Sequence, residues 1–295
     1  GFYLVHAQDS DDDKNLSDFL DEIDSTQAAD EASQAKAIAD LGAYLNRHAD
    51  VPLCDPFILS IVLAQAETAI VIPTGNDGDD ELGYPANIED YRPIIRLFHH
   101  QQTRARMAEY LDEVLGIGDN DGAPTQTAAA LDAFAQSSAL DGFTEDGDVF
   151  VNTGIIPIGA YDVSDAGNTK VERVDYSNFG PGLCVVGPSE GSATPADDQF
   201  LRGIRPPKRK IVAADLQGPG GWSRDQNLLV SGDSNLRGFG GTSAAAAQAV
   251  GLLALLSEAD PSRSPSDLRH ALIAEAVDGG GGYNLQTGYG RMMVG

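Results

Sequence analysis

A single short segment limits the fold more than any other feature of the sequence. Residues 69–73, Ala-Ile-Val-Ile-Pro, form a continuous apolar run that leads directly into the turn-forming residues 74–78, Thr-Gly-Asn-Asp-Gly. Such a run, rich in β-branched residues, is typical of a strand buried on both faces, as found in parallel sheets covered by helices. In open α/β sheets, binding and catalytic sites lie at the carboxyl ends of the strands. The segment therefore predicts an α/β protein with a site near residues 74–78.

The remainder of the chain alternates between helical and extended patterns. Apolar residues recur at helical spacing over about 16–45, 57–67, 88–110, 125–136, 243–257 and from Pro265 onward. The first stretch is long enough for one or two helices, and Asp55 and Ser264 are the expected N-caps of the second and the last. Strands are expected at 154–160, 183–186, 211–214 and 228–230. This alternation predicts an α/β fold of three layers, with a mainly parallel sheet flanked by helices.

The formal net charge of −26 excludes one class of partner. A field of this sign repels polyanions, so we expect no nucleic acid to bind. Three explanations of the aspartate-rich stretches stay open, namely a solvated acidic surface, adaptation to salty surroundings, and calcium binding. No stretch has the spacing of an EF-hand loop, so we name no metal ligands and keep a structural calcium ion as an open alternative. The stretches are residues 9–13, 77–81, 119–121 and 141–148.

Further features bear on the compartment. The longest apolar run, residues 244–256, is interrupted by Gln248 and Gly251 and is too short to cross a bilayer, so no membrane partner is expected. The sequence begins with Gly1 rather than Met, and no basic stretch precedes an apolar one, so no signal peptide is visible, which suits a processed or a truncated chain. Cys54 and Cys184 have no neighbouring Cys or His, so they predict no zinc site. Buried free thiols are favoured, and one disulfide stays open for an oxidising compartment.

Residues 240–247, Gly-Gly-Thr-Ser-Ala-Ala-Ala-Ala, place Ser243 where a glycine turn enters a helix of small residues. Glycine allows the sharp turn, and the small side chains let the helix pack deeply and hold the hydroxyl rigidly. The unpaired N–H groups and the positive dipole end at a helix start stabilise an anion that develops beside the serine, as acyl transfer requires. The simpler alternative is that Thr242 or Ser243 only caps the helix.

Asn76 has a similar pair of interpretations. In a Gly-Asn-Asp-Gly turn, asparagine is most often a residue that tolerates a left-handed backbone. Its side-chain amide is also a donor of the kind that completes an oxyanion hole. Taken alone, neither Asn76 nor Ser243 decides between a structural and a catalytic role.

Together these segments resemble the subtilase family, and more closely its kexin-like and proprotein-convertase-like branch. Residues 241–246 match the family's nucleophile motif, and residues 75–78 match its oxyanion-hole segment. Other pieces are similar in order and spacing, so the resemblance covers about residues 69–85 and 154–290. These pieces are Tyr-Pro-Ala at 84–86, the strand at 155–162, the Ser-Asn-Phe-Gly turn within 175–180, Val-Val-Gly-Pro-Ser at 185–189, the segment at 211–218 and the helix at 261–276.

The resemblance implies a secreted serine endopeptidase of subtilisin-like fold, which hydrolyses peptide bonds through an acyl-enzyme. It implies Ser243 as the nucleophile and Asn76 as the oxyanion donor. It also implies that Thr74 and Gly75 line the substrate pocket, with proteins or peptides as substrates. No cofactor is required for this chemistry.

The sequence departs from the family pattern, and two interpretations follow. The family's catalytic Asp and His motifs are not recognisable. We expect them upstream of residue 1, so that the chain is the C-terminal part of a catalytic domain and is inert by itself. The alternative is a degenerate, inactive relative that binds proteins. Ala247 stands where the family usually has proline, and the strand that pairs with substrate is not recognisable before Asp55.

Residues 87–153 have no counterpart in the family pattern. We expect them to form a helical insertion within a single domain that spans residues 1–295. The insertion contains His99 and His100, and an adjacent histidine pair on a helix is expected to be exposed rather than catalytic.

Overall fold

The computed structural model describes residues 14–26, 31–115, 126–137, 140, 153–162, 172–189, 211, 213–214, 230–231, 240–278 and 282–293. The contacts separate two compact units. One is drawn from Gly1–Ala64 and Glu89–Gly142, and we call it the helical unit. The other is drawn from Gln65–Ile88 and Phe143–Gly295, and we call it the sheet unit.

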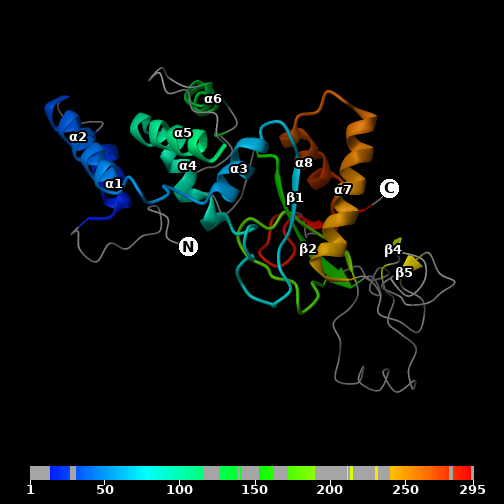
Figure 1. Ribbon diagram of the computed structural model, residues 1–295. Coiled ribbons are helices and arrows are strands. Elements are labelled where there is room, and N and C mark those ends of the chain that lie inside the picture. Colours follow the sequence, from blue (N-terminus) through cyan, green and yellow to red (C-terminus); the bar gives the residue numbers. More distant parts are fainter. Residues whose placement is uncertain are drawn as a thin grey trace. The chain divides into compact units, whose positions relative to one another are not determined.

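The helical unit consists of helices whose apolar faces meet. Its helices are α1 (Leu16–Thr26), α2 (Glu31–Arg47), α3 (Pro56–Ala64), α4 (Arg92–Phe98), α5 (Gln101–Leu115) and α6 (Gln126–Ala135) (Figure 1). In α1 the apolar residues at positions i, i+3, i+4 and i+7 are all buried, as expected for an amphipathic helix. α1 packs against α2, where the rings of Phe19 and Tyr44 lie 4.8 Å apart between centroids.

The helices expected within residues 87–153 are present, but they group with the N-terminal helices. α4 contacts α3, and α5 contacts α2 and α6. Each of these helices has an apolar face that needs a partner, and Leu41 of α2, Phe98 of α4 and Met107 of α5 are almost fully buried. The single domain of residues 1–295 with a helical insertion at 87–153 stays a prediction.

The sheet unit is built on a five-stranded sheet of order β1-β2-β3-β7-β6. Its strands are β1 (Ile70–Pro73), β2 (Ile155–Asp162), β3 (Val185–Ser189), β6 (Val277–Asp278) and β7 (Gly290–Arg291). β1, β2, β3 and β7 are parallel to one another, and β6 runs antiparallel to β7. A separate antiparallel pair joins β4 (Ala213–Ala214) and β5 (Val230–Ser231). The predicted α/β class with a mainly parallel sheet is confirmed.

Two helices, α7 (Gly241–Ala259) and α8 (Pro265–Ala274), lie side by side on one face of this sheet (Figure 1). Alternate residues of β2, namely Ile156, Ile158 and Ala160, are fully buried in the same core as residues of both helices. The helices contribute Ala245, Ala246, Ala249, Leu252, Leu253, Leu268 and Leu272 to that core. Because the first turns of α7 pack through alanines, its backbone lies close to the strands.

α7 extends beyond the apolar run 244–256 and has 19 residues. Among the described residues it alone has the length and composition of a membrane-spanning helix, a test that the core helix of a soluble protein also passes. Its packing on β1, β2 and β3 accounts for its apolar composition. The absence of a membrane partner stays a prediction.

Most predictions at the ends of elements are confirmed. Ser264 caps α8 in a capping box, in which its Oγ accepts a hydrogen bond from Asp267 N at 3.1 Å and Asp267 Oδ2 accepts one from Ser264 N at 3.0 Å. Asp55 Oδ1 accepts a hydrogen bond from Phe57 N at 2.8 Å where α3 begins. One prediction is wrong, because β1 is an edge strand of the described sheet and only its Ile72 is buried. β2 and β3 are the strands with buried residues on both faces.

Both cysteines are free and buried, as the sequence favoured. Burial raises the pKa of the Cys54 thiol to about 12 and also raises the pKa of Cys184. Both thiols therefore stay protonated at neutral pH and pack as small apolar side chains.

The adjacent histidine pair is split between surface and interior. His99 is exposed, as expected, but the expectation is wrong for His100, whose side chain is only 5% exposed. The pair lies at the break between α4 and α5 rather than within one helix, and His100 Nε2 lies 3.5 Å from Asp24 Oδ1 of α1. Burial lowers the pKa of His100, and the Asp24 carboxylate opposes that shift.

Candidate active site

The turn after β1 and the start of α7 meet, although they are more than 160 residues apart in sequence. Thr242 N donates a hydrogen bond to Asn76 Oδ1 at 2.8 Å, and Thr242 Oγ1 donates to the same oxygen at 3.2 Å. Gly75 N donates to Thr242 Oγ1 at 3.3 Å. The structure thus brings Asn76 next to the residue that precedes Ser243.

The start of α7 has no side-chain cap. Gly240 occupies the N-cap position with an extended backbone and has no side chain to cap the helix, and the side chain that accepts from the first turn is the distant Asn76, through Thr242 N. Thr242 and Ser243 lie inside the first turn, so the alternative in which one of them caps the helix does not describe this structure. The Ser243 side chain is exposed, whereas Thr242 and the three alanines after Ser243 are buried.

Gly241 is a position that only glycine fits. Its φ is +80°, in the left-handed region that side chains disfavour. A Cβ there would lie 3.1 Å from Asn76 Oδ1 and 3.3 Å from Asn76 Nδ2. The glycine therefore permits both the sharp entry into the helix and the close approach of the Asn76 amide.

The orientation of the Asn76 amide follows from these contacts. Since Oδ1 accepts from the Thr242 backbone, Nδ2 is the end that can donate to another group. Asn76 is exposed, as is Ser243. The first N–H groups of α7 have no partner within the helix and carry its positive dipole end. A hydroxyl, a side-chain amide donor and helix N–H groups thus gather where a tetrahedral oxyanion could be stabilised.

Thr74 and Gly75 lie directly before Asn76, and the Thr74 side chain does not face a pocket. Thr74 is fully buried, and its Oγ1 donates to Asn178 O at 3.1 Å. Its carbonyl accepts from Gly83 N at 2.7 Å. Gly75 is half-buried with φ +106°. The predicted role of both residues in substrate binding stays a prediction, and for Thr74 it would involve the backbone.

The end of β3 supports the same turn, through residues that the sequence did not single out. Tyr176 Oη donates to Ser189 Oγ at 2.8 Å, and Ser189 Oγ donates to Gly241 O at 3.0 Å. Gln248, which follows the Ala247 that stands in place of the family's usual proline, donates from Nε2 to Pro188 O at 2.8 Å. These side chains lie in segments with a recognisable motif. The bonds from Ser189 to Gly241 and from Gln248 to Pro188 join residues that are 52 and 60 positions apart, so sequence spacing alone could not reveal these contacts.

No histidine among the described residues hydrogen-bonds Ser243. His270, on α8, is the one histidine in the described part of the sheet unit, and it is exposed. Nor do the described residues contain a group of three His, Cys, Asp or Glu side chains that could hold a metal ion. The described site therefore presents a hydroxyl and hydrogen-bond donors, with no histidine base among its described residues.

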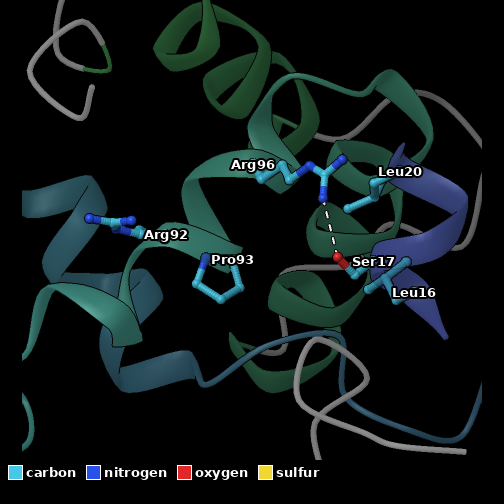
Figure 2. A pocket seen from close by; sticks show the side chains of 6 residues that line it. All are labelled: Leu16, Ser17, Leu20, Arg92, Pro93 and Arg96. Atoms are coloured by element: carbon cyan, nitrogen blue, oxygen red, sulfur yellow. Dashed lines mark hydrogen bonds between the residues drawn. The ribbon is translucent and has the colours of Figure 1, made fainter. Parts of the chain in front are cut away.

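A hollow of about 240 Å³ lies elsewhere, within the helical unit (Figure 2). Arg96 crosses it and donates to Ser17 Oγ at 3.2 Å, and to the carboxylates of Asp21 and Asp24 at 2.6 and 2.7 Å. The guanidinium charge is balanced by those carboxylates, and the remaining walls are mostly apolar. The lining residues are Leu16, Ser17, Leu20, Arg92, Pro93 and Arg96, so none of the predicted site residues contributes to it.

Comparison with known families identifies the class of protein. Residues 54–290 match the family model described as the Subtilase family, Peptidase S8. Because the match covers most of the 295 residues, the chain belongs to the subtilase family, which is a family of serine proteases.

The match to an individual solved structure covers less of the chain than the family model does. The structure of a serine protease MycP1, described as an essential component of the type VII (ESX-1) secretion system, is similar at 21% sequence identity with a TM-score of 0.30. The match covers 47% of this chain and 29% of the MycP1 chain, so it spans less than a third of that protein. A comparison with curated proteins gave no significant match.

Proposed function

We propose that this chain carries the nucleophile and the oxyanion hole of a subtilisin-like endopeptidase, with Ser243 as the nucleophile and Asn76 as the oxyanion donor. The observation that carries the proposal is the hydrogen bond from Thr242 N to Asn76 Oδ1 at 2.8 Å. That bond holds the Asn76 amide beside the first turn of α7, with Nδ2 available to a group bound at Ser243.

The chemistry follows the general course of serine proteolysis. The Ser243 hydroxyl attacks the scissile carbonyl while a histidine takes its proton. Nδ2 of Asn76 and the backbone N–H of Ser243 stabilise the oxyanion of the tetrahedral intermediate. The intermediate collapses to an acyl-enzyme as the protonated histidine gives its proton to the leaving amine, and water then releases the acyl group. No cofactor takes part in these steps.

Finer features of the proposal rest on the motif resemblance. The family's catalytic Asp and His motifs are not recognisable in this sequence, so in this proposal the two residues lie upstream of Gly1 and the chain is the C-terminal portion of a catalytic domain. The kexin-like branch is favoured by the Ser-Asn-Phe-Gly turn within residues 175–180. Thr74 and Gly75 border the substrate's cleaved residue, the substrates are proteins or peptides, and the enzyme is secreted. A structural calcium ion remains an alternative explanation of the acidic stretches.

One observation favours a second candidate function, a protein-binding module without catalysis. The described residues bring no histidine to Ser243, and a serine without its base is a poor nucleophile. In that case the Ser243 hydroxyl would have no catalytic role, and Ser243→Ala would leave the biological activity unchanged.

Labelling by a fluorophosphonate separates the two candidates. We expect the full-length protein to react at Ser243, and Ser243→Ala to abolish the reaction. Ser257→Ala, a serine substitution on the same helix, serves as the matched control and should leave labelling unchanged. A folded full-length protein that resists the reagent would favour the binding module. We expect the 295-residue chain alone to show no peptidase activity, because no histidine base for Ser243 lies among its described residues.

A further inference from the structure

Asn178 lies in the described segment that leads into β3, and it does not touch the Ser243 side chain in any described contact. We propose that Asn178 is the positioning residue that fixes the oxyanion donor Asn76, by holding the backbone on both sides of it. This inference rests on the proposed function and assigns a further residue to the same site.

The side chain of Asn178 binds the segment after Asn76. Its Oδ1 accepts hydrogen bonds from three successive backbone N–H groups, those of Asp77 at 2.9 Å, Gly78 at 3.0 Å and Asp79 at 3.4 Å. Successive N–H groups that converge on one oxygen form a concave nest in the backbone. One buried carbonyl oxygen thus sets the path of the chain directly after Asn76.

The backbone of Asn178 binds the segment before Asn76. Its N–H donates to Gly75 O at 3.1 Å, and its carbonyl accepts from Thr74 Oγ1 at 3.1 Å. Asn76 is therefore the residue between two segments that are both tied to Asn178. The Asn76 side chain is bound instead to the start of α7, where Gly75 N also donates to Thr242 Oγ1.

The close fit of Asn178 also explains why residue 75 is glycine. A Cβ on Gly75 would lie 2.7 Å from Asn178 Nδ2, closer than any side chain tolerates. Asn178 itself is 2% exposed, so it is out of reach of a substrate. Its effect on catalysis must pass through Asn76, which makes it a positioning residue rather than a catalytic one.

The choice of substitution follows from the acceptor. Asn178→Ala removes the oxygen shared by three N–H groups and frees the loop after Asn76. Asn178→Asp keeps the shape of the side chain and an acceptor oxygen in the same position, and backbone N–H groups bind a carboxylate well. Ser264→Ala is the matched control for lost stability, since it removes the capping box of α8 without contacting the loop.

The test uses the full-length protein with a peptide substrate, and kcat is expressed per site titrated by a fluorophosphonate. Asn178→Ala is expected to lower kcat by at least about tenfold and to change KM by less than about threefold, because the oxyanion hole acts in the transition state. Asn178→Asp should restore most of the rate. Ser264→Ala should lower the melting temperature and keep the wild-type kcat per titrated site.

A wild-type kcat per titrated site in Asn178→Ala would overturn the positioning role. Should Asn178→Ala fail to fold, Asn178→Asp decides, and a loss of tenfold or more in that variant would overturn the role of the acceptor. If the wild-type protein is not labelled at Ser243, the proposed function fails separately. Amide hydrogen exchange at residues 77–79 then tests the holding role alone, since it should speed up in Asn178→Ala and stay slow in Asn178→Asp. Unchanged exchange in Asn178→Ala would refute it.

Discussion

At the scale of single residues, the site depends on the two ends of one amide group. Asn76 Oδ1 is held by the Thr242 backbone, and this leaves Nδ2 free to donate to the oxyanion of the proposed mechanism. If the amide were rotated so that Oδ1 and Nδ2 changed places, an acceptor oxygen would face the negative charge. The hydrogen bond from Thr242 is therefore as important as the identity of residue 76.

Asn76→Ala removes the donor and should reduce kcat of the full-length enzyme by about 10² to 10³, the loss observed when one oxyanion-hole donor is removed in subtilisin. Asn76→Asp keeps an acceptor for Thr242 N but puts negative charge where the donor was, so it should be at least as impaired. Both variants should keep the wild-type melting temperature within a few degrees. Rates close to wild type in Asn76→Asp would exclude a donor role for this side chain.

At the scale of elements, the entry into α7 has a strict backbone requirement. Gly241→Ala places a side chain at φ +80° and 3.1 Å from Asn76 Oδ1, so we expect it to destabilise the fold by about 1 to 3 kcal/mol and to impair labelling of Ser243. Gly251→Ala, on the same helix, is the matched control. Nothing lies within 4 Å of a Cβ at Gly251, so this substitution should stabilise the helix by about 0.5 to 1 kcal/mol. Chemical denaturation measures both.

The helical unit contains a buried histidine that makes its stability depend on pH. Burial lowers the pKa of His100 below its ordinary value of 6.5, so the unfolded chain takes up the proton before the folded one does. Stability from this group is present above pH 6.5 and is lost as the pH falls below it, by at most about 1.4 kcal/mol per pH unit. The charged groups that face it are Asp24, Arg96 and Arg104, with His99 beside it in the chain.

His100→Asn should therefore make the free energy of unfolding less dependent on pH between 7.5 and 5, and His99→Asn, at an exposed position, should not. If the free energy of unfolding depended on pH equally in His100→Asn and in the wild type, His100 would have the same pKa in the folded and the unfolded chain.

The sequence predicted correctly those elements that depend on residues close together in the chain. The caps at Asp55 and Ser264 and the helix after Ser243 follow from neighbouring residues, and the structure has them. Burial depends on neighbours that are distant in sequence. β1 was expected to be covered on both faces but lies at an edge of the described sheet, and His100 was expected at the surface but packs beside α1.

At the scale of the whole molecule, the sequence motifs led to the correct family, while the division into units could not be predicted. The motifs at 75–78 and 241–246 were recognisable one by one, and the fold brings them together through Thr242. The supporting side chains Asn178 and Ser189 lie inside other motif segments, but their contacts with Asp77 and with Gly241 cross 101 and 52 residues of sequence. The helices of residues 87–153 share a unit with 1–64 because their apolar faces complement one another, which no local pattern reveals.

The net charge of −26 predicts a salt response of the whole chain. Screening of self-repulsion should raise the melting temperature as NaCl increases from low to physiological ionic strength, where the screening length falls to about 8 Å. Calcium chloride and magnesium chloride at equal ionic strength should then give equal increases. A larger increase with calcium alone would support a structural calcium ion, and no increase with any salt would contradict the repulsion argument.

The most direct test of the central claim is a crystal structure of the full-length protein after reaction with a fluorophosphonate. The account predicts a covalent bond from phosphorus to Ser243 Oγ, with the phosphoryl oxygen about 2.7 to 3.1 Å from Asn76 Nδ2. An adduct on another residue, or a phosphoryl oxygen that points away from Asn76, would contradict it.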